Sequence, residues 1–155
     1  WNLDGVSKNA DGYQLHLSKE INDTFYIAGD YQDVSLNSLD LSVLTAGLGY
    51  KRNISDSSVF FAELDWARVE AAASAFGVSV SDSENGYQTS FGIRSNLTSK
   101  FEIKAAVEYL DISSDSTTTF VAGATYNFTD TFAINSDFKV DSDSSRYPIG
   151  ARFYF

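Results

Sequence analysis

The feature that most constrains the fold is an alternation of apolar and polar residues that recurs along nearly the whole chain. Such a period of two is typical of β-strands, whose successive side chains point to opposite faces. The alternating segments are longer than the average globular strand of about 5–6 residues and suit a tilted membrane strand of about 9–11 residues. We predict nine of them, at 12–20, 24–33, 39–51, 57–69, 85–95, 100–111, 117–127, 131–141 and 146–155.

The two faces of each predicted strand differ in charge. In segment 100–111, Phe101, Ile103 and Val107 share one face, whereas Lys104 and Glu108 share the other. The alternation does not say which face is inside, because a soluble barrel also alternates. The apolar face, however, carries charge only near the strand ends, and a charge at the bilayer midplane costs about 2–4 kcal/mol. We therefore expect the apolar face to contact hydrocarbon. The charged residues near the ends of that face are Lys19, Asp33 and Arg68.

Aromatic residues gather at both ends of the apolar face, as in the two girdles of a membrane barrel. A soluble core has no reason to place its aromatic residues in two rings. The predicted girdle consists of Phe25, Phe101, Phe132 and Phe155 beside the tight turns, and of Tyr31, Trp66, Tyr87, Tyr109 and Tyr147 beside the looser loops.

The opposite face carries charges of both signs, which we expect to form a paired network inside the barrel. At about eight to ten strands the interior is just wide enough for side chains to fill it, and unpaired buried charge is costly. We predict a largely plugged, polar lumen. Its charged residues are Asp30, Lys51, Glu63, Asp65, Arg94, Glu102, Lys104, Glu108, Asp137, Lys139 and Arg152.

The predicted connections alternate between two kinds. Four are tight and share an Asn-x-Ser/Thr pattern, which is formally a glycosylation sequon. Turn chemistry explains the pattern better, because Asn, Asp, Ser and Thr side chains bond nearby backbone groups. The other connections are longer and rich in Ser and Asp, including a loop expected at 71–85. The tight turns are at 21–25, 53–57, 96–101 and 127–132.

The 155 residues are predicted to form one domain, an all-β, closed, antiparallel up-and-down transmembrane β-barrel. Because bacterial single-chain barrels have even strand counts, we interpret Trp1–Ser7 as the outer end of a first strand whose start is missing. That makes ten strands, with eight as the rival count. Pro148, which cannot donate to a strand ladder, is expected at a bulge or ladder end.

Composition excludes several classes of function. The formal net charge of −10 disfavours binding to nucleic acid, and the absence of cysteine excludes disulfides and thiolate metal sites. No window holds the ~18 apolar residues of a membrane-spanning helix. His16 is the single histidine and lies on the polar face beside Gln14 and Ser18. We predict that it is a lumen hydrogen-bonding residue, and we predict no catalytic residue, metal site or cofactor.

The closing segment "GARFYF", with Phe155 last, resembles the terminal strand of bacterial outer-membrane proteins. The hairpins "GYQTSFGIRSNLTSKFEIKAAVEYLDI" and "FVAGATYNFTDTFAINSDF" are similar to the small outer-membrane barrel or porin-like families, in the manner of OmpX, Ail and the OmpA barrel. This resemblance implies integral localisation in the outer membrane of a Gram-negative bacterium. It further implies contact with lipopolysaccharide, assembly by the barrel-assembly machinery, periplasmic tight turns and extracellular loops.

Four functions fit this sequence to different degrees. We favour a non-enzymatic barrel with a structural or loop-mediated surface role. The alternatives are a small pore for ions or small solutes, an outer-membrane enzyme that uses His16, and a soluble ligand-binding barrel. Acidic loop residues could share divalent cations with lipopolysaccharide phosphates, although a simply solvated loop is the preferred interpretation. These acidic residues are Asp82, Glu84, Asp115, Asp141 and Asp143.

Overall fold

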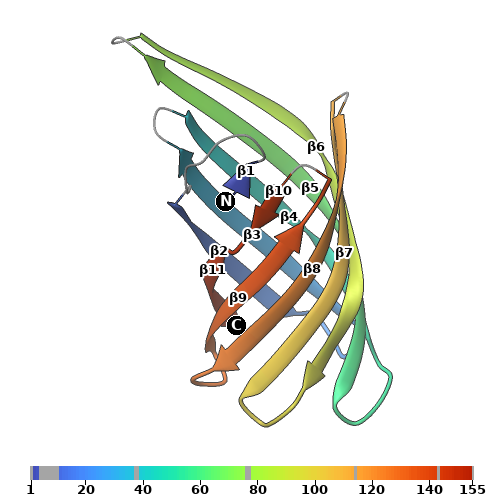
Figure 1. Cartoon of the computed structure of the whole chain (residues 1–155). Helices are drawn as coiled ribbons and strands as arrows, with labels where there is room; N and C mark the ends of the chain where they lie inside the picture. Colours follow the sequence, from blue (N-terminus) through green and yellow to red (C-terminus); the bar gives the residue numbers. More distant parts are fainter. Residues whose placement is uncertain are drawn as a thin grey trace.

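The computed structural model describes residues 2–3, 11–36, 39–75, 78–113, 115–142 and 144–154, and its regular elements are all strands of one sheet (Figure 1). The described part of the chain holds no helix of the length and hydropathy required to cross a membrane. The strands are β1 (Asn2–Leu3), β2 (Asp11–Glu20), β3 (Phe25–Leu36), β4 (Leu39–Asn53), β5 (Ser58–Ala75), β6 (Val78–Asn96), β7 (Phe101–Ile112), β8 (Asp115–Asn127), β9 (Phe132–Val140), β10 (Ser144–Arg146) and β11 (Ile149–Tyr154).

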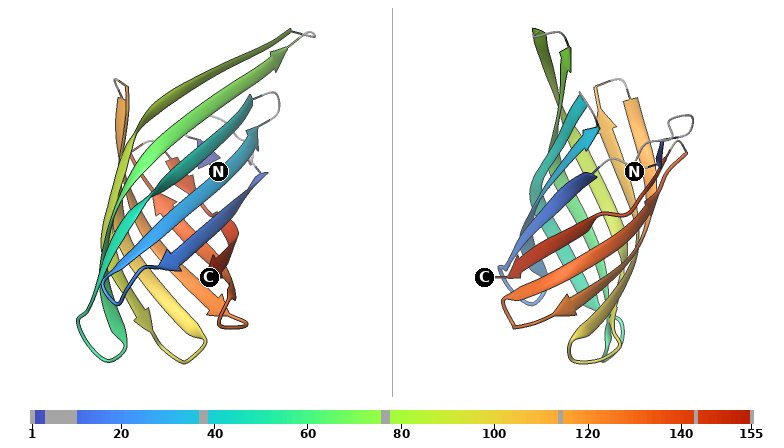
Figure 2. Two further views of the ribbon diagram at one scale, coloured as in Figure 1. Left: turned by 180° about the vertical axis from the view of Figure 1, so that it is seen from behind. Right: turned by 60° about the vertical axis from the view of Figure 1, so that its left-hand side comes forward.

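Nine of the described strands close into a barrel. Strands β2 to β9 follow one another in antiparallel pairs, and β9 then pairs with β11. Strand β11 closes the barrel by pairing in parallel with β2, with Gly150 beside Gln14 and Tyr154 beside Ser18. Figure 2 shows the blue β2 and the red β11 side by side. The closed all-β barrel is therefore confirmed.

The prediction of ten strands in a fully antiparallel barrel is not what the structure has, and eight strands do not match it either. In an up-and-down barrel with an odd number of strands, the first and last strands must run in the same direction. Of the segment Trp1–Ser7, only Asn2–Leu3 is described. This short β1 pairs with β10. Nearer the turns, β11 pairs directly with β2, so β1 does not take part in closing the barrel.

A break at Pro148 divides the last strand into β10 and β11, which both lie along β9. The Pro148 carbonyl accepts a hydrogen bond from the Asp137 amide at 3.1 Å. Because proline has no amide hydrogen to donate, this is a place where the ladder can end and restart, as the sequence predicts.

The tight turns lie at one end of the barrel, hereafter the turn end, and the opposite end is the loop end (Figure 1). The turns occupy residues 21–24, 54–57, 97–100 and 128–131, as predicted. Their polar side chains bind the backbone: Asn22 Oδ1 accepts hydrogen bonds from the Thr24 and Phe25 amides, each at 2.8 Å. Thr98 and Thr129 accept equivalent bonds in two other turns.

The hairpin of β5 and β6 rises far above the rest of the barrel at the loop end, in green in Figures 1 and 2. The loop expected at 71–85 is thus wrong, because strand pairing continues up to Ala75 and Val78. The residues of this segment are mostly small or polar, so the apolar-polar alternation is weak there. The backbone hydrogen bonds between two neighbouring strands do not depend on an apolar face. Strand β6 meets β7 only from Gly86 onward.

The barrel is inverted relative to a soluble protein. Leu64 and Phe120, on the outer wall, are 61% and 58% exposed, whereas Asp65 and Arg152, on the inner wall, are 5% and 4% exposed. The alternation alone does not say which face is inside. In the structure the charged face lines the interior. The polar interior is therefore where a site for small ligands or ions would lie.

Candidate functional site

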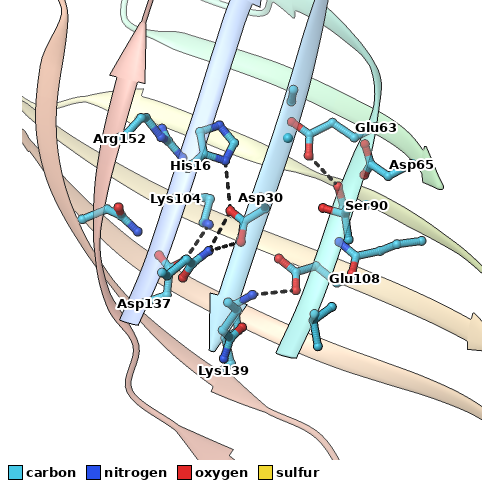
Figure 3. Close-up of a pocket in the computed structure, with 18 of the residues that line it drawn as sticks. His16, Asp30, Glu63, Asp65, Ser90, Lys104, Glu108, Asp137, Lys139 and Arg152 are labelled. Atoms are coloured by element: carbon cyan, nitrogen blue, oxygen red, sulfur yellow. Dashed lines mark hydrogen bonds and ion pairs between the residues drawn. The ribbon is translucent and has the colours of Figure 1, made fainter. Parts of the chain in front are cut away.

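The barrel interior contains a polar cavity of about 70 Å³ (Figure 3). Nine of the predicted lumen residues line this cavity. They are Asp30, Glu63, Asp65, Arg94, Lys104, Glu108, Asp137, Lys139 and Arg152.

Two lysines join the strands on either side of β8. Lys104 on β7 binds Asp137 on β9 at 2.9 Å, and Lys139 on β9 binds Glu108 on β7 at 3.0 Å. Gly123 of β8 lies between them, and a Cβ atom there would overlap the Asp137 carboxylate. The glycine therefore provides the space that this charged pair occupies.

Glu63 is the centre of a second group. It accepts hydrogen bonds from the Tyr26 hydroxyl at 2.5 Å, the Ser90 hydroxyl at 3.0 Å and Arg94 Nη2 at 3.2 Å. The Arg94 guanidinium also lies over the Phe61 ring, 4.2 Å from its centroid, an arrangement that favours a cation. Both charges of the Glu63–Arg94 pair are thus held from several sides.

A third group joins β2 and β3. His16 Nδ1 lies 3.1 Å from Asp30 Oδ2, and Gln14 Nε2 donates to both Asp30 oxygens at 2.9 Å. In the register His16 lies directly opposite Asp30. The single histidine thus has a carboxylate partner inside the barrel and lies far from both rims.

Asp65 differs from the other lumen carboxylates. It lines the cavity, is almost fully buried, and makes no hydrogen bond or ion pair with any described residue. Its register neighbours are Gly47 on β4 and Gln88 on β6. A Cβ atom at Gly47 would overlap Asp65 Oδ1, so the missing side chain leaves room for this carboxylate.

Two of the predicted lumen residues lie outside the cavity lining. Lys51 pairs with Glu20 near the turn end, and Glu102 faces Arg152 at 3.6 Å. The loop end has a comparable pair, with Arg146 Nη2 donating to Asp141 Oδ2 at 2.6 Å. Ion pairs therefore occur at several heights along the interior.

Eight of the nine predicted girdle residues lie in the described part of the chain. Phe25, Phe101 and Phe132 are the first residues of β3, β7 and β9, directly after tight turns. Tyr31, Trp66, Tyr87, Tyr109 and Tyr147 lie further toward the loop end, whereas Phe155 is outside the described residues.

Three of the loop-end tyrosines direct their hydroxyl groups at acidic partners. Tyr87 and Tyr109 both donate to Asp111 Oδ2, at 3.3 and 3.2 Å, and Tyr31 donates to Asp33 Oδ2 at 3.2 Å. An apolar ring with a polar tip suits a boundary between hydrocarbon and water.

Comparison with known proteins decides the family. The model of the outer membrane protein beta-barrel domain matches residues 3–128. The chain belongs to this family. It is accordingly a bacterial outer-membrane β-barrel, integral to the membrane, and its apolar outer wall is the surface that the bilayer covers.

Two solved structures resemble this outer-membrane barrel. One is Ail, the attachment invasion locus protein of Yersinia pestis, with 22% identity, a TM-score of 0.53, and coverage of 81% of this chain and 88% of Ail. The other is the KdgM porin, with 13% identity, a TM-score of 0.50, and coverage of 95% and 99%. At these identities the likeness establishes the fold. No curated protein matches the chain.

Sequence reasoning placed His16 in the interior of this outer-membrane barrel but missed other uncharged interior residues and part of the aromatic surface. Tyr26 and Asn135 join the lumen, where both are buried. Asn135 shares the polar face of its segment with Asp137 and Lys139, and Tyr26 has the same parity as Asp30, so alternation is the signal that could have found them. The missed exterior rings contact predicted ones: Tyr50 contacts Phe25, Phe153 contacts Phe132, and Tyr13 contacts Tyr31.

The described acidic loop residues are distributed over three parts of the chain. Asp82 and Glu84 are exposed on β6, Asp115 begins β8, and Asp141 binds Arg146. Asp143 is outside the described residues. Within the described ranges, no three acidic or histidine side chains are arranged to hold a metal ion.

Proposed function

We propose that this barrel is a sealed, non-enzymatic scaffold of the outer membrane that acts at the cell surface through its β5–β6 hairpin. The observation that carries the proposal is the contrast between the ion-paired interior and the free edge of that hairpin. In this proposal the charged lumen residues serve stability and closure, and His16 is a structural hydrogen-bonding residue.

The interior supports a sealed lumen. Lys104–Asp137 and Lys139–Glu108 cross-link β7 to β9, and Arg152 of β11 faces Glu102 of β7. The cavity of about 70 Å³ holds a few water molecules at most. In this proposal the network closes the described part of the lumen to solutes.

Planar-bilayer recording of the refolded chain tests the seal. We expect no steady conductance steps from the natural sequence. A Lys139→Ser, Glu108→Ser double variant removes both members of one pair and leaves neither charge unpaired. We expect it to produce brief openings. Regular conductance steps from the natural sequence would contradict the sealed scaffold and favour the pore.

The pore is the second candidate, and the polar cavity itself is the observation in its favour. The inward glycines argue against it. Gly123 makes room for the Asp137 carboxylate, and Gly150 faces the Asn135 side chain and Gln14. These positions are therefore filled by neighbouring groups and do not widen a channel.

The free edge of β6 supports a surface role. Strand β6 pairs with β5 along its whole length but with β7 only from Gly86, so residues 78–85 have no described partner on that side. An open edge presents unpaired backbone groups, and an extended segment of another protein can bind there as an added strand. Ser81–Asn85 are exposed and polar, so this edge stays soluble without a partner.

We propose that this hairpin faces the outside, that the tight turns face the periplasm, and that the loop-end girdle contacts lipopolysaccharide. We also propose assembly by the barrel-assembly machinery. The natural chain has no cysteine, so a thiol reagent can label only the cysteine that is introduced. An impermeant maleimide should label Ser81→Cys on intact cells and Ser99→Cys only after the outer membrane is opened. The reverse pattern would invert the orientation.

A shortened hairpin tests the surface role. Ala72 and Ser81 are partners in the register, so replacing residues 73–80 with Asn-Gly closes a two-residue hairpin at that level. Cells that carry this variant should lose adhesion to protein-coated surfaces while keeping normal amounts of folded barrel. Unchanged adhesion, or no adhesion by the natural chain, would overturn the role of the hairpin. The full name of Ail, attachment invasion locus protein, refers to attachment and motivates the assay.

A further inference from the structure

The charges around the lumen cavity do not balance. Its lining contains five carboxylates, four lysine or arginine side chains and His16. Each of the four basic side chains already faces a carboxylate other than Asp65, at 2.9–3.6 Å. One of those partners, Glu102, lies outside the lining, and Asp30 pairs with His16. The carboxylate left over is Asp65.

The excess of negative charge in the cavity is concentrated around Asp65. The ionised groups that act on it through space are Glu63, Asp30 and Glu108, all of them acidic. Its side chain lies within the cavity lining, next to Gly47, whose missing side chain makes room for it. Figure 3 shows Asp65 beside Glu63 and Ser90 at the cavity wall. A buried carboxylate in a negative field either takes up a proton or is balanced by a cation.

Neutral oxygen atoms in the same cavity also lack partners. Gln14 Oε1 and Asn135 Oδ1 are buried and accept no hydrogen bond from any described residue. Both residues line the cavity with Asp65. Thr45 and Ser90 add hydroxyl oxygens to the lining. The cavity therefore offers oxygen acceptors and negative charge together, which are the groups that bind a hydrated alkali cation.

We propose that the lumen cavity binds a hydrated monovalent cation, sodium or potassium, with the Asp65 carboxylate as its counter-ion. The hydration shell of the cation would donate hydrogen bonds to the hydroxyl oxygens of Thr45 and Ser90 in the lining. A divalent ion fits less well, because Asp65 is the one carboxylate of the lining without a basic or histidine partner and balances a single positive charge. The described residues contain no group of three acidic or histidine side chains arranged to hold a metal.

The test measures unfolding of the full chain in detergent micelles in sodium chloride, potassium chloride and N-methyl-D-glucamine chloride at equal concentration. A ligand that binds only the folded state stabilises it in proportion to the logarithm of its concentration above the dissociation constant. We expect the urea midpoint to rise with sodium or potassium and to stay lower in the organic salt, which is too bulky for the cavity.

The variant Asp65→Asn should abolish the difference between the salts, because it keeps the shape and removes the charge. Glu20→Gln is the matched control: it removes a carboxylate that already pairs with Lys51 near the turn end. It should keep the difference. Equal midpoints for the natural chain in all three salts would overturn the proposal and indicate a protonated Asp65. A cation effect that persists in Asp65→Asn would also overturn it.

If Asp65→Asn does not refold, sodium-23 NMR of the natural chain tests the cation site. The natural chain should broaden the sodium-23 resonance, and potassium should reverse this broadening. No excess linewidth, together with equal urea midpoints in potassium chloride and in the organic salt, would overturn the site. The result is independent of the proposed sealed lumen, which the conductance recordings test, since a sealed barrel and a conducting one can each bind a cation here.

Discussion

The two halves of β6 show how one strand serves two environments. From Gly86 to Asn96 it lies between β5 and β7, with Ser90 and Arg94 directed inward and Phe91 exposed outward. From Val78 to Asn85 it pairs only with β5, and Ser81–Asn85 are exposed. The lower half is fixed by pairing on both sides and by interior contacts, whereas the upper half keeps an edge free. Stability and recognition are thus separated along a single strand.

The comparison predicts its largest effect for a charge inside the lower half. Arg94→Ala leaves Glu63 buried without its cation, a change that costs about 3–5 kcal/mol for a buried pair. Glu84→Ala, an exposed position in the upper half, is the control and should change the free energy of unfolding by less than about 0.5 kcal/mol. Urea unfolding in micelles measures both. Similar values for the two variants would remove the distinction between the halves.

The second prediction concerns the outer wall. Ile93 is on the lipid side of the lower half, and Ile93→Arg should cost about 2–4 kcal/mol if it lies near the bilayer midplane. The matched change Ser81→Arg lies on the same face of β6 above the barrel, where water accepts the charge at little cost. Refolding into lipid vesicles should reveal the difference. An Ile93→Arg variant as stable as Ser81→Arg would mean that this wall does not contact hydrocarbon.

The smallest effect is expected at the turn where the lower half ends. Thr98 Oγ1 accepts hydrogen bonds from the Lys100 and Phe101 amides, at 3.2 and 3.1 Å. Thr98→Ala should therefore cost about 1 kcal/mol. Ser99→Ala, in the same turn, removes a hydroxyl with no described hydrogen bond and should be neutral. Equal effects would show that the Asn-x-Ser/Thr pattern does not act through turn bonding.

Much of the barrel could be predicted from the sequence, because its strongest determinants are local. Parity separated Ile103 from Lys104, and the polar side chain at the second position of each tight turn marked the strand ends. The apolar face carries no charge in the middle of the strands, and this absence predicted that it points outward to the lipid.

The rest depends on partners that parity does not specify. Above Glu70 the alternation consists mainly of alanine against serine, with Val78 and Val80 in β6, and it lacks the aromatic and leucine residues that mark the strands of the barrel wall. The parallel closure of β11 against β2 depends on which strand edge is available, a property of the whole sheet. Inside the barrel, the sequence placed Asp65 among the charges, but only the geometry reveals that it alone has no partner among the described residues.

Spin labelling along β7 is the most direct test of the central claim, that the apolar face contacts lipid and the charged face fills the interior. Single cysteines from 102 to 108 would carry the label in a chain with no natural cysteine. In lipid vesicles, accessibility to oxygen should alternate, with maxima at Ile103, Ala105 and Val107 and minima at Lys104, Ala106 and Glu108. Maxima at the second set, or no alternation, would contradict the account.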